Sequence, residues 1–208
     1  SQLDGWDEAW AIRTLRHYLK ERTSNDPHDP NWGETRFRVD GQIEVIDDGG
    51  LLDERCHILA LVNGRRPLLG GPKYNAVYFV GPFGFSPDKC VTTDWERAFR
   101  YALLLRSKSI DATKAEHIAR LYASVRSGHG PDGLDVLDPV ASATDLPRLQ
   151  VRVHPPNLKQ GVDEIYEVIF TAHHTDGSRG MNVWRVTLGP GHFSGMYRPV
   201  ARVGRILR

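Results

Sequence analysis

The sequence predicts an α+β fold with an N-terminal helix, antiparallel strands, two central helices and a C-terminal antiparallel sheet. Two kinds of periodicity predict this class. Apolar residues recur every three or four positions in three segments, as in amphipathic helices, and every second position in several others, as in half-buried strands. Turn-forming pairs such as Asp40-Gly41 and Asn63-Gly64 separate neighbouring strand segments, which is typical of antiparallel hairpins.

The first helix is expected over residues 5–22. Asp4 is the predicted N-cap, because its carboxylate can accept hydrogen bonds from the free N–H groups of the first turn. Residues 24–31 contain two prolines and several turn-forming residues, so the helix ends before them. The apolar stripe at helical spacing consists of Ala11, Ile12, Leu15, Tyr18 and Leu19.

Two hairpins and one further strand are expected next. Asp40-Gly41 and Asn63-Gly64 tolerate the positive φ angles of a tight hairpin turn. Pro67 lacks a backbone N–H, so its strand is expected at a sheet edge, whereas the last strand of this group is apolar throughout and is expected inside a sheet. The expected strands are 36–39, 42–46, 57–62, 65–69 and 76–80.

Two helices are expected in the middle of the chain. Thr93 and Glu96 fit a capping box, in which each side chain accepts a hydrogen bond from the backbone N–H of the other. Asp111 is expected to begin the second helix, and Ser127-Gly128 to end it. The predicted buried faces comprise Phe99, Ala102 and Leu103 in the first helix and Ala115, Ile118, Ala119 and Tyr122 in the second.

Residues 128–147 are rich in glycine and proline and are predicted to be a connecting loop. It would join an α+β part, residues 1–127, to a β part, residues 148–208, although one compact domain over 1–208 fits the same sequence. In the β part, residues 149–154, 164–174 and 182–188 alternate as strands do, and residues 194–208 fit either a strand or a helix.

The composition excludes some functional classes. No apolar run approaches the roughly 18–20 residues that span a bilayer, and the N-terminus has no basic segment followed by an apolar one. We therefore expect a soluble, cytoplasmic protein with no membrane partner. Cys56 and Cys90 are too far apart in the chain for a zinc knuckle, and two cysteines make no disulfide framework.

Charge is unevenly distributed although the net charge is only +1. Residues 1–60 carry 13 acidic and 7 basic side chains, a net charge of −6. Residues 177–208 carry 6 arginines and no acidic residue, a net charge of +6. Such a separation can steer an anionic ligand, attract the acidic end of another copy, or hold the two ends of one chain together.

The leading functional hypothesis is a binding or accessory protein whose arginine-rich C-terminal surface holds a polyanion, with nucleic acid as the expected partner. Arginine presents a planar fork that contacts phosphate through two hydrogen bonds, and aromatic rings can stack on unpaired bases. Arg185 alternates with two apolar residues, so it is expected on the side of its strand opposite the core. The predicted contact residues are Arg179, Arg185, Arg198, Arg202 and Arg205, with Trp184 and Tyr197.

Two alternatives remain open. One is an enzyme, such as a metal-dependent hydrolase, with a histidine-rich pocket at one end of the C-terminal sheet, although no recognised metal-ligand spacing is present. Its candidate ligands are His154, His174, Asp176 and His192. The other is a self-associating module in which residues 1–60 of one copy meet residues 177–208 of the next. The sequence assigns no catalytic residue and no cofactor, and it does not decide whether the protein is an enzyme.

Overall fold

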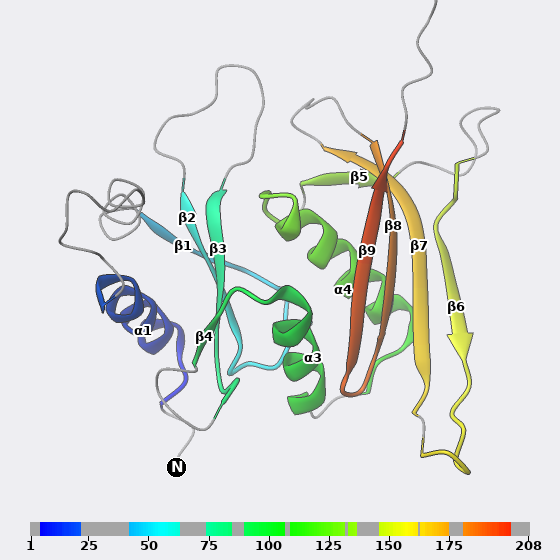
Figure 1. Cartoon of the computed structure of the whole chain (residues 1–208), viewed down its shortest axis with the longest axis horizontal. Coiled ribbons are helices and arrows are strands. Elements are labelled where there is room, and N and C mark those ends of the chain that lie inside the picture. Colours follow the sequence, from blue (N-terminus) through cyan, green and yellow to red (C-terminus); the bar gives the residue numbers. More distant parts are fainter. Residues whose placement is uncertain are drawn as a thin grey trace, which may run out of the picture.

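The computed structural model describes residues 5–21, 42–62, 74–84, 90–106, 109–131, 133–136, 146–161, 163–174 and 181–200. These residues form an α+β fold, as predicted, with two antiparallel sheets (Figure 1). The elements in chain order are α1 (Glu8–Glu21), β1 (Ile43–Ile46), β2 (His57–Val62), β3 (Tyr74–Val80), β4 (Val91–Thr92), α3 (Trp95–Leu105), α4 (Ala112–Arg126), β5 (Leu134–Val136), β6 (Gln150–His154), β7 (Ile165–His174), β8 (Met181–Gly189) and β9 (His192–Pro199).

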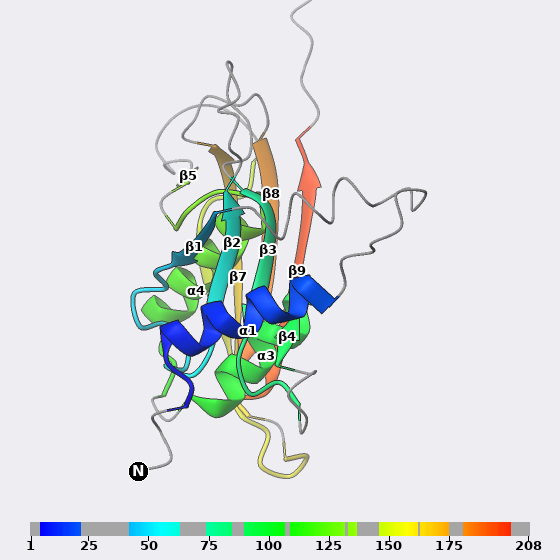
Figure 2. The same cartoon turned by 90° about the vertical axis from the view of Figure 1, so that its left-hand side faces the viewer.

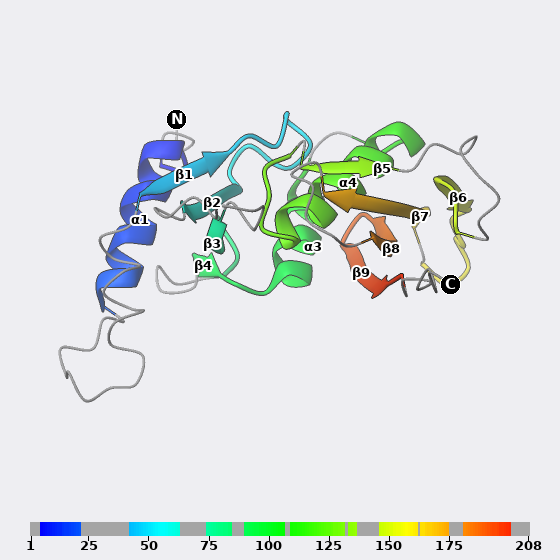
Figure 3. The same cartoon turned by 90° about the horizontal axis from the view of Figure 1, so that it is seen from above.

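The elements stack in four layers. Strands β1, β2, β3 and β4 form the N-terminal sheet in that order, and β5 to β9 form the C-terminal sheet. Helix α1 covers one side of the N-terminal sheet, and α3 and α4 lie between the two sheets (Figures 1 and 3). One side of the C-terminal sheet therefore faces helices, and we call the other side its outer face.

Helix α1 lies across the strands of the N-terminal sheet (Figure 2). Its predicted stripe is confirmed, since Ala11, Leu15 and Leu19 are buried in one cluster with β2 and β3 residues, including Leu59 and Tyr78. The helix begins at Glu8, and the carboxylate of Asp7 accepts a hydrogen bond from the Trp10 N–H at 2.7 Å. Asp7 therefore caps this helix, and the predicted cap, Asp4, lies outside the described residues.

Strands predicted at 42–46, 57–62 and 76–80 are confirmed as β1, β2 and β3. Strand β2 pairs with β1 along one edge and with β3 along the other. The predicted hairpin between 57–62 and 65–69 is wrong, because β2 has no free edge for it. Residues 36–39 and 65–69 lie outside the described ranges.

Helix α3 begins one residue later than a capping box at Thr93 would require. Asp94 is the N-cap, and its carboxylate accepts from the Arg97 N–H at 3.0 Å. The predicted pairing of Thr93 with Glu96 is therefore wrong. The Glu96 carboxylate instead accepts from the Gly195 N–H of β9 at 3.3 Å, which ties the start of α3 to the C-terminal sheet.

Helix α4 has the predicted ends. The Asp111 carboxylate accepts from the Lys114 N–H at 2.8 Å, and Ser127 is the C-cap. Gly128 follows with a φ of 81°, a left-handed conformation that favours glycine after a helix. The segment predicted as a connecting loop then contributes β5, which pairs with β7 as part of the C-terminal sheet.

Strand β7 organises the C-terminal sheet. It pairs with β8 along one edge and with β6 and then β5 along the other, and β9 pairs with β8. The predicted strands at 149–154, 164–174 and 182–188 are confirmed within two residues at each end. The segment that fitted either a strand or a helix is a strand, β9, as far as Pro199, and residues 201–208 lie outside the described ranges.

One continuous core joins the two sheets through α3 and α4. Its members run from Ile46 of β1 to Phe193 of β9, on both sides of the predicted connection at 128–147. Tyr122 of α4 lies near its centre, with its ring 5.3 Å from that of Phe99 and 6.2 Å from that of Trp184. Among the described helices none is long and apolar enough to cross a membrane.

Candidate functional site

Two neighbouring cavities beside the N-terminal sheet are acidic. The first, of about 610 Å³, has Arg106 and His57 in its lining, and the second, of about 890 Å³, has Arg120 and His117. Carboxylates outnumber these basic groups in both. The acidic lining residues are Glu8, Asp47, Asp48, Asp53 and Glu54 in the first cavity and Glu44, Asp47, Asp48 and Asp135 in the second.

Several of these carboxylates already have partners within the chain. Asp48 accepts from the Gly50 and Leu52 N–H groups at 3.0 and 2.9 Å, and Asp53 accepts from the Arg55 guanidinium at 2.8 and 3.1 Å. Burial by itself raises the pKa of Asp53, but the hydrogen bonds and charge of Arg55 outweigh it and lower the pKa overall. The first cavity therefore keeps its negative charge and would repel an anion.

Neither cysteine offers a reactive thiol. Burial raises the pKa of the Cys56 thiol to about 12, so it stays protonated at neutral pH, and Cys90 is also buried. Within the described ranges no three histidine, cysteine, aspartate or glutamate side chains come together in a way that could hold a metal ion.

A third cavity is a groove of about 410 Å³ on the outer face of the C-terminal sheet, and its charged groups are basic. Arg185 of β8 lies opposite Met196 of β9, and Arg198 lies opposite Val183. Because residues opposite each other in an antiparallel pair share a face, both arginines project from the outer face. The groove is lined by these two arginines and by Pro147, Ile169, Val183, Met196 and Tyr197.

The groove has an apolar floor and one wall outside the sheet. Ile169 and Val183 are buried beneath it, whereas Met196 is 60% exposed. The Thr171 hydroxyl on β7 donates a hydrogen bond to the Pro147 carbonyl at 2.8 Å, which holds the chain segment before β6 against the outer face. The site therefore combines an apolar surface with two cationic groups.

The guanidinium groups of Arg185 and Arg198 form no ion pair or hydrogen bond with any residue that the structure describes. Elsewhere on this sheet two basic side chains lie beside carboxylates. Arg152 lies 3.5 Å from the Glu167 carboxylate, and the His173 imidazole lies 3.4 Å from that of Asp135. Both groove arginines are also exposed, so their guanidinium groups are free to contact a ligand.

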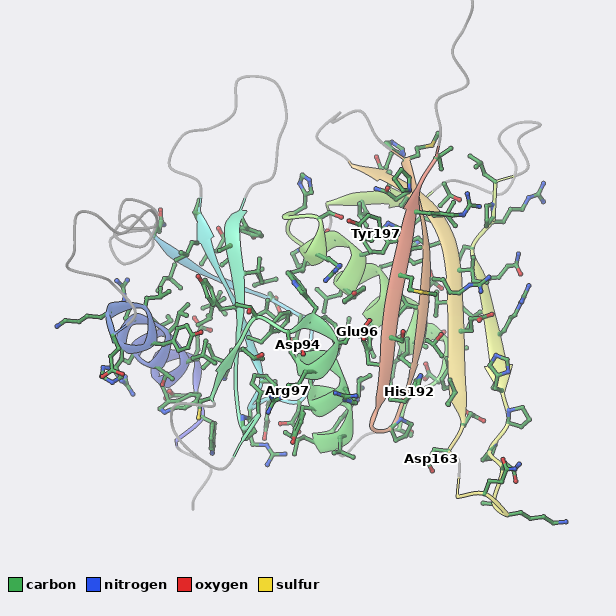
Figure 4. The ribbon with its side chains drawn as sticks, viewed as in Figure 1. Asp94, Glu96, Arg97, Asp163, His192 and Tyr197 are labelled. Atoms are coloured by element: carbon green, nitrogen blue, oxygen red, sulfur yellow. The ribbon has the colours of Figure 1, made fainter. Side chains whose placement is uncertain are left out.

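The two predicted aromatic residues occupy different environments. Trp184 is only 2% exposed and lies in the core against Tyr122, on the side of the sheet opposite Arg185, so it is not part of the outer face. Tyr197 packs on Trp184 with 4.8 Å between ring centroids and is 52% exposed. It lies towards one end of β9, and His192 lies at the other (Figure 4).

Of the five predicted arginines, the structure brings Arg185 and Arg198 together. The other three, Arg179, Arg202 and Arg205, lie outside the described residues. Sequence reasoning missed Arg126, whose guanidinium lies 5.8 Å from the ring centroids of both Trp95 and Tyr122. Nothing in its local sequence distinguishes this arginine, because the aromatic residues around it come from a different helix and from the preceding turn of its own.

The predicted histidine pocket does not assemble. His154 is opposite Ile165 at the start of β7, whereas His174 is at the other end of that strand, about 30 Å away at roughly 3.3 Å per residue. His192 lies at the same end of the C-terminal sheet as His154, but on β9, three strands away from β6. At roughly 4.8 Å between neighbouring strands, the two histidines are about 14 Å apart. Asp176 lies outside the described ranges.

Antiparallel pairing therefore separates His154, His174 and His192, so these three histidines do not meet in one pocket. Self-association of the acidic and basic ends is not tested by one chain and stays a prediction. Comparison of the chain with protein-family models, curated proteins and solved structures gave no match.

Proposed function

We propose that this protein binds a polyanion, nucleic acid, through the groove on the outer face of its C-terminal sheet. One observation carries the proposal. Arg185 and Arg198 line the same groove, and their guanidinium groups have no partner among the residues that the structure describes. Two exposed guanidinium groups that are not neutralised by carboxylates favour an anionic ligand.

The chemistry of the groove supports a phosphate-bearing chain over a small inorganic anion. Each guanidinium can donate two parallel hydrogen bonds to one phosphate group. The apolar floor formed by Ile169, Val183 and Met196 offers a surface for the sugar or base that accompanies each phosphate. A ligand with alternating charged and flat apolar parts would use both features.

The distribution of charge over the molecule favours this face over the others. The first acidic cavity lies beside the N-terminal sheet, and the outer face of the C-terminal sheet is at the opposite end of the layered fold (Figure 3). An approaching polyanion would be repelled from the first end and attracted to the second.

The test is to measure binding of a labelled single-stranded oligonucleotide by fluorescence anisotropy over a series of salt concentrations. Replacing both groove arginines, Arg185→Ala with Arg198→Ala, is expected to weaken binding roughly tenfold or more, because hydrogen bonds to charged groups are each worth about 1.5–3 kcal/mol. The slope of log affinity against log salt is expected to fall by about 1.4, since each phosphate contact to a single strand contributes about 0.7.

The matched control replaces two exposed arginines of α1, Arg13→Ala with Arg16→Ala, which changes the net charge equally at the far end of the molecule. This variant is expected to bind as the unmodified protein does. No binding at low salt, or an equal loss in both double variants, would contradict the proposed site.

A further inference from the structure

The exposed ring of Tyr197 extends an aromatic stack. Its centroid lies 4.8 Å from that of Trp184 with an interplanar angle of 34°, so the two rings overlap in a tilted stack. Trp184 is buried, which fixes the lower member of the stack, whereas Tyr197 is 52% exposed. The stack therefore ends in solvent at a rigid aromatic surface.

A cationic group lies beside the same aromatic cluster. The Tyr122 ring is 6.2 Å from that of Trp184 and 5.8 Å from the guanidinium carbon of Arg126. Arg126 is exposed, and its guanidinium forms no ion pair or hydrogen bond with any residue in the described ranges. Arg126 thus lies next to Tyr122 and Tyr197 next to Trp184, and both residues are exposed.

Strand β9 separates this cluster from the groove on the outer face. It is the last strand of the C-terminal sheet, and Tyr197 is next in sequence to Arg198. Successive side chains of a strand project from opposite faces, so the Arg198 side chain projects from the outer face and the Tyr197 ring from the helix side. Tyr197 also borders the groove, because β9 is the edge strand of this sheet. Gly195 and Glu96 hold this strand against α3 through their hydrogen bond, and Figure 4 shows Glu96 beside the middle of β9.

We infer that a single-stranded nucleic acid crosses the edge formed by β9, with one base stacked on Tyr197, one phosphate bound by Arg126 and the following phosphates bound in the outer groove. This inference rests on the proposed function and deepens it. It adds Arg126 to the contact residues and assigns Tyr197 the role of a base-stacking platform.

The geometry favours a single strand over a duplex. A base can stack on a protein ring only if its own face is uncovered, and the bases of a duplex cover one another. Every base has a flat face, so this contact would not select a particular sequence. The chemical class is therefore single-stranded DNA or RNA with little sequence preference.

The decisive comparison uses two labelled oligonucleotides of the same length, oligothymidylate and an abasic strand that has the same phosphates and no bases. The unmodified protein is expected to bind oligothymidylate about tenfold more tightly, within the range expected for stacking of one base. Tyr197→Ala is expected to remove this preference and leave the affinity for the abasic strand unchanged. Tyr197→Phe, which keeps a flat ring, is expected to retain the preference.

Arg126 is tested in the same assay through its salt dependence. Arg126→Ala is expected to weaken binding of both oligonucleotides and to lower the salt slope by about 0.7, the contribution of one phosphate contact. Arg13→Ala on α1 is the control with equal loss of charge, and its salt slope is expected to stay unchanged. Thermal unfolding followed by circular dichroism checks that each variant is folded.

The possible failures are distinguishable. Equal affinity of the unmodified protein for both strands would overturn the stacking role of Tyr197 while the binding of polyanions stands, and this comparison depends on no variant. Tighter binding of a duplex than of the single strand would also overturn it. If neither oligonucleotide bound, the proposed function itself would be wrong. If the salt slope of Arg126→Ala were unchanged, Arg126 would not be a phosphate contact.

Discussion

At the scale of single residues, Gly195 is a position where the backbone of β9 lies directly against the core. A Cβ atom at this position would lie 2.2 Å from Cε1 and 2.6 Å from Cζ of Tyr122. Tyr122 is fully buried, and its ring is enclosed by the rings of Phe99, Phe193 and Trp184. The ring has no space into which it could move, so only glycine fits beside it.

Gly195→Ala is therefore expected to lower the free energy of unfolding by about 1–3 kcal/mol, the usual cost of overpacking a well-packed core. Urea denaturation measures the loss. Gly5→Ala is the matched control, because a Cβ at Gly5 would meet no atom within 4 Å. If the two variants were equally stable, the close approach of β9 to Tyr122 would be wrong.

At the scale of elements, the choice of N-cap residue at the start of α3 decides which hydrogen bond Glu96 makes. Thr93 and Asp94 are both good N-cap residues, and local sequence does not choose between them. The tertiary structure chooses Asp94, because the Thr92 hydroxyl accepts a hydrogen bond from the Asp94 N–H at 3.1 Å and β4 continues to Thr92. Because Glu96 does not accept from the Thr93 N–H, its carboxylate accepts from the Gly195 N–H of β9 instead.

Asp94→Ala is expected to lower the free energy of unfolding by about 1 kcal/mol, the typical cost of losing an N-cap. Thr93→Ala is expected to change it by less than about 0.5 kcal/mol, as for most exposed positions. Chemical denaturation of the two variants decides between the caps. If Thr93→Ala lowered the free energy of unfolding more than Asp94→Ala, the capping box predicted from the sequence would be correct instead.

At the scale of the whole molecule, one buried cluster joins the two sheets. Phe79 of the N-terminal sheet contacts Trp95 and Phe99 of α3, with ring centroids 5.0 and 5.7 Å apart. Phe99 in turn lies 4.9 Å from Phe193 of the C-terminal sheet. Loss of either sheet would expose the helices between them, so the described layers are expected to unfold together.

Calorimetry is expected to show a single unfolding transition. Phe79→Leu in one sheet and Val186→Ala in the other are each expected to lower the midpoint of that same transition, by roughly 2–4 °C for each kcal/mol lost. Two resolved transitions, each sensitive to only one of these variants, would support the two-part division of the chain at residues 128–147 instead.

Much of the fold follows from local pattern. The strand predicted at 57–62 has those bounds in the structure, and the predicted ends of α4 are confirmed. Alternation also placed Arg185 and Trp184 on opposite sides of β8, because side chains alternate along any strand. The prediction of Trp184 as a contact residue beside Arg185 does not fit that rule, and the structure places Trp184 in the core.

The candidate site depends on contacts that no local pattern contains. Arg185 and Arg198 share a groove only because β8 and β9 pair in a register that sets Arg185 opposite Met196. Arg126 lies near the aromatic stack because α4 packs against the C-terminal sheet. The sequence could not decide whether the histidines form one pocket either. Whether the ends of two strands lie close together depends on which strands are neighbours in the sheet.

The sequence by itself determined where the three described helices and the longer strands lie and which side of each is apolar, because both follow from the spacing of residues along the chain. Only the tertiary structure decided which strands pair, which arginines are left without partners and which aromatic ring ends in solvent. These features depend on residues far apart in the chain, and their positions are set by the common packing of both sheets against α3 and α4.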